Sequence, residues 1–158
     1  MDKETSTLAL VIVTALVLAV VVSPLIPAGG EKYSEIGVLG PSLKIGGYPT
    51  SVAVDQQIRL FVFVGNHQRE VSYYQVLLKA GNQSTVITNS TSADLPTIVE
   101  RSLVLADNKS STIPVTFAIP TAGLNQRVIF ELWSFDVATS HFSYTGLWNQ
   151  VWINVTGS

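Results

Sequence analysis

The side chains that could do acid–base or metal chemistry are few and scattered along the sequence. The two histidines, His67 and His141, stand in no H-x-x-x-H pattern and beside no matching carboxylate, so their spacing predicts no metal site. Glu131 shares a strand face with Trp133, as a glycosidase carboxylate could, but the sequence places no second carboxylate beside it. We therefore expect no catalytic residue, no metal, no cofactor and no enzyme activity.

Composition narrows the class of protein further. The chain has no cysteine, which excludes disulfides, thiolate catalysis and zinc–sulfur sites. Its 11 acidic and 9 basic residues give a net charge of −2, so we expect no nucleic-acid partner, because such a partner would require a basic surface. Charged residues make up only 13% of the sequence, and serine, threonine, asparagine and glutamine supply the polar surface instead. This balance favours an extracytoplasmic protein.

Asparagine sequons are the clearest signal for a modification. A chain rich in serine and threonine produces one or two N-x-S/T sequences by chance, whereas four favour a glycosylated surface. The candidate glycosylation sites, which make N-linked glycans possible, are Asn82, Asn89, Asn108 and Asn154.

These side chains fall on a series of short strands separated by turns. Nine β-branched and aromatic segments occur at intervals of roughly ten residues, which is typical of an antiparallel β-sandwich. The expected strands are 33–39, 51–54, 58–64, 71–79, 84–88, 97–105, 112–119, 127–136 and 147–155, with a loop over 88–94 and a hairpin turn at 107–109. Because no Cys…Trp…Cys framework is present, we expect an all-β, immunoglobulin/fibronectin-like sandwich over residues 33–156.

Two strands carry apolar side chains on both faces, which identifies possible partner-contact surfaces. In 58–64, Phe61 and Phe63 alternate with the aliphatic residues, so either another part of the domain covers them or a partner does. In 147–155, Trp148 and Trp152 share a face with the Asn154 sequon, which predicts an accessible docking or sugar-stacking surface. The alternative is that the tryptophans cap the edge of the sandwich under Tyr73 or Tyr74.

Residues 8–28 form an apolar run without a single charge, long enough for a helix to cross a hydrocarbon core of about 30 Å. We expect a single-pass membrane protein with a short cytoplasmic N-terminus (1–7), a transmembrane helix (8–28), a linker (29–32) and an extracytoplasmic domain. The orientation depends on the sequons, since Lys3 and Lys32 flank the run about equally. Thr14 and Ala15 give the helix a weak close-approach face. A cleaved secretory signal is one alternative, and a pilin-like leader, cut before the run, is another.

Several segments together resemble a known family. They are residues 31–41 (EKYSEIGVLGP), 47–49 (GYP), 64–67 (VGNH), 71–74 (VSYY), 130–133 (FELW), and 147–155 with both of its tryptophans. Their order is similar to that of an uncharacterised, mainly archaeal, membrane-anchored family, domain of unknown function sixteen-sixteen, over most of residues 31–155. The resemblance implies an archaeal cell-surface location and an extracytoplasmic sandwich, and it brings no catalytic residues.

The predicted function is that of a non-enzymatic, membrane-anchored surface module that acts through protein contacts. Membrane lipid and other membrane or surface proteins are its expected partners, with self-association as another route, and an accessory subunit of an envelope complex is the expected role. The first alternative is a pilin-like or thread-like filament subunit with the apolar helix in the filament core. The second is a carbohydrate-binding surface module that uses Trp148 and Trp152.

Overall fold

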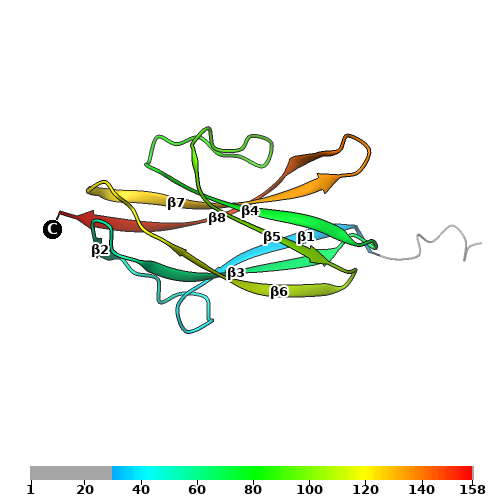
Figure 1. Cartoon of the computed structure of the whole chain (residues 1–158), viewed down its shortest axis with the longest axis horizontal. Coiled ribbons are helices and arrows are strands. Elements are labelled where there is room, and N and C mark those ends of the chain that lie inside the picture. The colour runs from blue at the N-terminus through cyan, green and yellow to red at the C-terminus, as the bar shows by residue number, and fades with distance from the viewer. Residues whose placement is uncertain (1–29, 158) are drawn as a thin grey trace, which may run out of the picture. The chain divides into compact units, whose positions relative to one another are not determined.

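The computed structural model of the chain describes residues 30–157 and forms a two-layered β-sandwich (Figure 1). Within this range the secondary structure consists of strands, without a helix. The strands are β1 (Tyr33–Leu39), β2 (Ser51–Ala53), β3 (Ile58–His67), β4 (Ser72–Gly81), β5 (Thr97–Leu105), β6 (Lys109–Phe117), β7 (Gly123–Asp136) and β8 (His141–Thr156).

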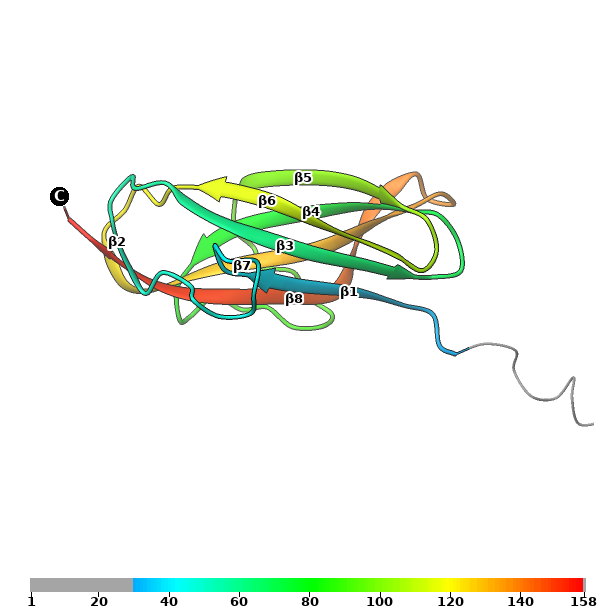
Figure 2. The ribbon, with the colours of Figure 1, turned by 90° about the horizontal axis from the view of Figure 1, so that it is seen from below.

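The strands form a three-stranded sheet in the order β1-β3-β6 and a five-stranded sheet in the order β2-β8-β7-β4-β5. Figure 2 shows the smaller sheet in front of the larger one. In immunoglobulin notation the order β1-β3-β6 corresponds to A-B-E, and the three central strands of the larger sheet, β8-β7-β4, correspond to G-F-C. The predicted all-β, immunoglobulin-like fold is therefore confirmed. One pairing departs from a fully antiparallel fold, because β2 runs parallel to β8.

The core lies between the two sheets and follows the alternation of each strand. Leu60, Val62 and Val64 of β3 are fully buried, and Phe130 and Leu132 of β7 face them from the larger sheet. Each such side chain contributes roughly 1.5–3 kcal/mol by leaving water. A domain without disulfides is held together by this packing.

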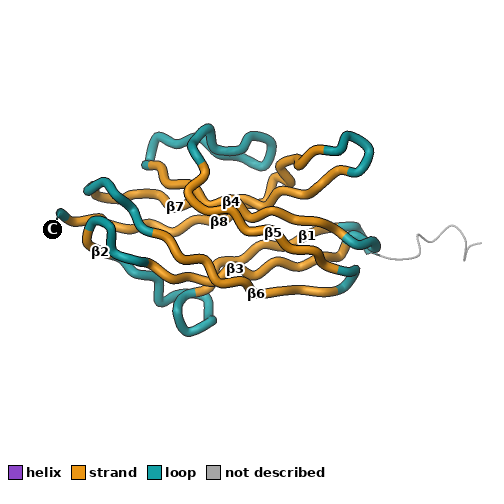
Figure 3. Tube along the Cα trace, viewed as in Figure 1, coloured by secondary structure: helices purple, strands orange, loops and turns teal. Residues whose placement is uncertain are grey.

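The prediction of a strand over residues 84–88 is wrong. These residues belong to a long loop, 82–96, which crosses the outer face of the larger sheet (Figure 3). The reason lies in the topology, because β4 already pairs with β5 on one side and β7 on the other. Segment 84–88 therefore cannot pair with β4, the strand that it follows, and Ile87 packs its side chain onto the outer face of the sheet instead.

The turn at 107–109 was predicted to close a hairpin, and this prediction is also wrong. The strands on either side of it, β5 and β6, lie in different sheets, so the turn carries the chain from one layer to the other. The two strands that do form a long hairpin are β7 and β8, and both start earlier than predicted.

The predicted transmembrane helix at 8–28, with Thr14 and Ala15, lies outside the described residues. Residues 30–157 contain no helix long and apolar enough to cross a bilayer.

Candidate functional site

The outer face of the five-stranded sheet, the side turned away from the core, carries several polar and aromatic side chains that could bind a ligand. Alternation along β4, β7 and β8 places their non-core residues there. All three tryptophans lie on it, as do the buried charges Lys79 and Glu131. Loop 82–96 divides this face into a covered half and an open half.

The covered half contains a buried ion pair. Lys79 Nζ lies 3.0 Å from Glu131 Oε2, and the two side chains are 7% and 0% exposed. Ala93 of the loop closes the pair, because its N–H donates to Glu131 Oε1 at 2.7 Å and its carbonyl accepts from Lys79 Nζ at 2.7 Å. Trp133 Nε1 donates to Glu131 Oε2 at 2.9 Å. Every polar atom of the pair is thus engaged, so Glu131 acts as a structural group that fastens the loop.

Further contacts hold the loop along its length. Ile87 and Ala93 form a small second core with Ile129 of β7, and Trp148 packs against it. Tyr144 Oη donates to the carbonyl of Thr88 at 2.9 Å. Burial, and to a lesser degree the negative charge of Glu131, raise the pKa of Tyr144 to about 12. The phenol therefore keeps its proton, and this hydrogen bond, at physiological pH.

The structure brings Trp148 and Trp152 together on the outer face, as predicted, and places Arg127 against both. The Arg127 guanidinium lies 5.2 Å from the Trp148 ring centroid and 5.6 Å from that of Trp152. Trp148 is half-buried beside the loop, whereas Trp152 is 39% exposed. The alternative of capping under Tyr73 or Tyr74 is wrong, because Tyr73 packs on Phe135 and Phe142 and Tyr74 is buried in the core.

The open half carries an apolar row that crosses four strands. Val104 (β5) lies opposite Tyr73 (β4), and Phe135 (β7) lies opposite Phe142 (β8). The ring centroids of Tyr73 and Phe142 are 4.9 Å apart, and those of Phe135 and Phe142 are 5.3 Å apart, both edge-to-face. Val104 is 63% exposed and Tyr73 is 40% exposed. We call these four residues the apolar row; three rings in contact at a surface are typical of an interaction site.

Phe61 and Phe63 lie on the opposite side of the sandwich, on the outer face of the three-stranded sheet. Both are half-buried, and the Arg59 guanidinium lies 5.3 Å from the Phe61 ring centroid. Because this sheet forms the other layer, the phenylalanines and the Trp148–Trp152 pair cannot form one contact surface.

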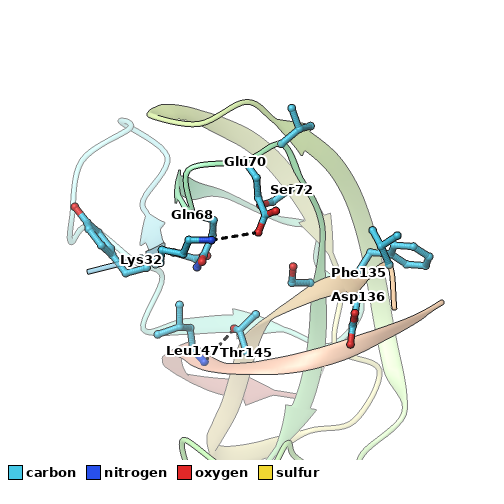
Figure 4. Close-up of a pocket in the computed structure, with 13 residues that line it drawn as sticks. Lys32, Gln68, Glu70, Ser72, Phe135, Asp136, Thr145 and Leu147 are labelled. Carbon is cyan, nitrogen blue, oxygen red and sulfur yellow. Dashed lines mark hydrogen bonds and ion pairs between the residues drawn. The ribbon is translucent and has the colours of Figure 1, made fainter. Parts of the chain in front are cut away.

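A mixed polar and apolar cleft of about 570 Å³ opens at the end of the sandwich where β1 begins (Figure 4). Its walls come from the start of β1, the β3–β4 turn, the end of β7 and the first half of β8. At the mouth of the cleft, Lys32 Nζ lies 3.9 Å from Glu70 Oε1, and both side chains are more than half exposed. This ion pair therefore contributes at most about 1 kcal/mol to the stability of the fold. Residues 30–157 contain no group of three histidines or carboxylates placed to hold a metal ion.

Asn66 fixes the turn that forms one wall of this cleft. The side chain is fully buried, and its Nδ2 donates to the carbonyls of Glu70 and Leu105 at 2.8 and 2.9 Å. Its Oδ1 accepts from the Gln68 N–H at 3.0 Å and from Tyr74 Oη at 3.1 Å. Asn66, near the end of β3, therefore has a structural role, because a buried amide must have all of its hydrogen-bond partners.

Two of the four sequons lie on a loop, and the other two include residues of the β-strands. Asn82 and Asn89 are exposed on loop 82–96. Asn108 is exposed in the β5–β6 turn, and Asn154 is half-buried in β8.

Comparisons with known proteins give a family and several distant folds. The sequence profile of a family described as Domain of unknown function (DUF1616) matches residues 27–154. No curated protein matches the sequence. The crystal structure of the CARDB domain of PF1109 from Pyrococcus furiosus, in complex with di-metal ions, is similar with a TM-score of 0.49 and 9% identity, over 79% of this chain and 89% of that one. Native alpha-2-macroglobulin from Escherichia coli, from domain MG7 to the C-terminus, is similar with a TM-score of 0.44 and 17% identity, over 82% and 17% of the two chains.

Proposed function

The chain belongs to the DUF1616 family, and on that premise we propose that its β-sandwich is a non-enzymatic, membrane-anchored surface module that binds another membrane or surface protein. In this proposal it is an accessory subunit of a larger complex. The observation that carries the proposal is the apolar row of Val104, Tyr73, Phe135 and Phe142 on the open half of the larger sheet.

The chemistry of the row favours a protein partner over a sugar. Three rings and one valine offer contact area at low conformational cost, which is typical of the centre of a protein interface. Sugar binding needs free hydrogen-bonding groups beside an aromatic ring. Gln75, two residues after Tyr73 on β4, is not free for this purpose, because its Nε2 donates to Glu100 Oε1 at 2.8 Å. A carbohydrate site at Trp148 and Trp152 has less support, because Arg127 already stacks on both rings.

The test is co-purification of the full-length chain from membranes of its own organism in mild detergent. We expect a membrane or surface protein to co-purify in fixed stoichiometry with the unaltered chain. Val104→Glu places a charge in the row and should reduce the recovered partner by about tenfold or more. The matched control is Val86→Glu on loop 82–96, where the valine is 68% exposed and outside the row; it should leave recovery unchanged.

Three outcomes would contradict the proposal. If the chain purifies alone as a monomer, it has no stable partner. If both variants lose the partner equally, the apolar row is not the contact surface. Recovery as long polymers of the chain alone would favour the filament alternative.

A further inference from the structure

We propose that N-linked glycans are attached to Asn82 and Asn89 on loop 82–96, and that Asn108 and Asn154 are not modified. This inference rests on the proposed extracytoplasmic location, since the sugar transfer takes place on that side of the membrane. It identifies which of four sequence-equivalent sequons the folded domain makes available.

The criterion is whether the three residues of a sequon lie outside the hydrogen-bonded ladders of the sheets. An acceptor sequon must enter the active site of the glycosyl-transferring enzyme, so residues held in a sheet ladder must first break backbone hydrogen bonds. Residues 82–84 and 89–91 lie within the loop and pair with no strand. The other two sequons run directly into the sheets.

The Asn89 sequon lies in an exposed turn of the loop. It lies at the tip of a turn in which the Thr88 N–H donates to the Thr91 carbonyl at 2.9 Å and Thr88 Oγ1 accepts from the Thr91 N–H at 3.0 Å. The backbone of Asn89 is packed against β8, where its carbonyl oxygen would be 2.3 Å from a Cβ at Gly146. The turn is thus fixed at its base while the Asn89 side chain is exposed.

Asn82 is ordered by its own sequon. Its Oδ1 accepts from the Ser84 N–H at 2.9 Å and from Ser84 Oγ at 2.6 Å, which forms an Asx-turn. Since Oδ1 takes both bonds, Nδ2, the atom that would carry the sugar, lies on the other edge of an exposed carboxamide.

The Asn108 sequon is held by β6 and by its own side chain. Lys109 and Ser110 pair with Asn66 and Gly65 of β3. Asn108 Nδ2 donates to Asp107 Oδ2 at 3.0 Å, so the atom to be modified is already engaged.

The Asn154 sequon is held on both sides. Asn154 lies opposite Ser51 of β2, and its Oδ1 accepts from the Asn125 N–H at 2.8 Å. The sequon hydroxyl, Thr156 Oγ1, donates to the Val52 carbonyl at 3.2 Å. Modification there would require β2 to separate from β8.

The test is intact mass and glycopeptide analysis of the full-length chain from its own membranes. We expect Asn82→Gln and Asn89→Gln each to lower the mass by one glycan and the double variant to carry none. Asn108→Gln and Asn154→Gln should leave the glycan mass unchanged. Within the Asn89 sequon, Thr91→Ser should keep the glycan and Thr91→Ala should lose it.

A glycan on Asn108 or Asn154, or the absence of one from either loop site, would overturn the inference. Labelling intact cells with an amine reagent that does not cross membranes separates this failure from that of the proposed location. A chain that is labelled but unglycosylated contradicts only the glycan sites, whereas an unlabelled chain contradicts the surface location as well.

Discussion

The outer face of the five-stranded sheet is covered over one half and bare over the other, although the same strands build both halves. Over the covered half, loop 82–96 buries Lys79, Glu131 and Ile129 and leaves Trp148 half-buried. Over the open half, Tyr73 and Val104 remain exposed. The loop contains no strand, and it covers the half of the face that holds the Lys79–Glu131 ion pair.

This difference indicates that the apolar row is exposed because loop 82–96 covers only the other half of the face. An antiparallel sheet usually turns a polar face to water. Here a fully hydrogen-bonded ion pair is buried beneath the loop, whereas Tyr73 and Val104 of the apolar row remain exposed to solvent. A surface of this kind favours a binding role for the open half and a structural role for the covered half.

The largest expected effect comes from breaking the buried pair. Glu131→Gln leaves the Lys79 charge buried without a counter-ion, which should lower the free energy of unfolding by about 3–5 kcal/mol. Denaturant unfolding of the full-length chain in mild detergent, followed by tryptophan fluorescence, measures this loss, since all three tryptophans lie on the outer face.

Two controls sharpen this contrast between the halves. Lys79→Met combined with Glu131→Gln removes both charges and should recover about 1–2 kcal/mol. Val104→Glu, in the open half, should change stability by less than about 0.5 kcal/mol, because the residue is a surface position. Equal losses from Glu131→Gln and Val104→Glu would remove the distinction between the halves.

Much of the framework could be predicted from local patterns. Alternation gave the bounds of β1 and β5 as observed, and it correctly placed the aliphatic side chains of β3 in the core. It also placed Trp148 and Trp152 on one face. Such signals are local, because a strand with one buried face carries its pattern in its own residues.

The site could not be predicted in the same way, because it depends on register between distant strands. Lys79 and Glu131 each look like a solvated charge in the sequence, and they meet only because β4 pairs with β7 and the loop folds over both. The apolar row was missed for the same reason, since its members come from four strands. The available signal was the two-residue spacing of Trp133 and Phe135 and of Phe142 and Tyr144, which places the aromatic rings of each pair on one face of their strand.

A second, smaller effect is expected where the loop backbone approaches β8. Gly146 has φ of 80°, and a Cβ there would lie 2.3 Å from the carbonyl oxygen of Asn89. Gly146→Ala should therefore cost about 2–4 kcal/mol, from the left-handed backbone and from displacement of the loop. Gly47→Ala is the matched control, because Gly47 has φ of 66° and no atom within 4 Å of a Cβ. It should cost only about 1–2 kcal/mol for the backbone. If the two costs are equal, the loop does not depend on this close approach.

The smallest effect is a pH dependence at the same boundary, through Tyr144. Its pKa is raised from 10.0 to about 12 in the folded chain, mainly by burial and then by Glu131. A phenol that holds its proton more tightly when folded contributes stability that is fully present below about pH 10 and is lost as the pH rises towards 12. Ionisation also removes the donor that binds the Thr88 carbonyl, so the loop should loosen in this range.

Tyr144→Phe separates the two contributions of this residue. It removes the hydrogen bond, which should cost about 1 kcal/mol at neutral pH, and it also removes one ionisable group from the alkaline range. The variant should then lose less stability than the unaltered chain between about pH 9 and about pH 11.5. Tyr33→Phe, on the exposed start of β1, should show the full alkaline loss, because its ring does not touch the loop. An unchanged alkaline slope in Tyr144→Phe would show that the boundary of the covered half is held by its apolar contacts and its ion pair, without the phenol.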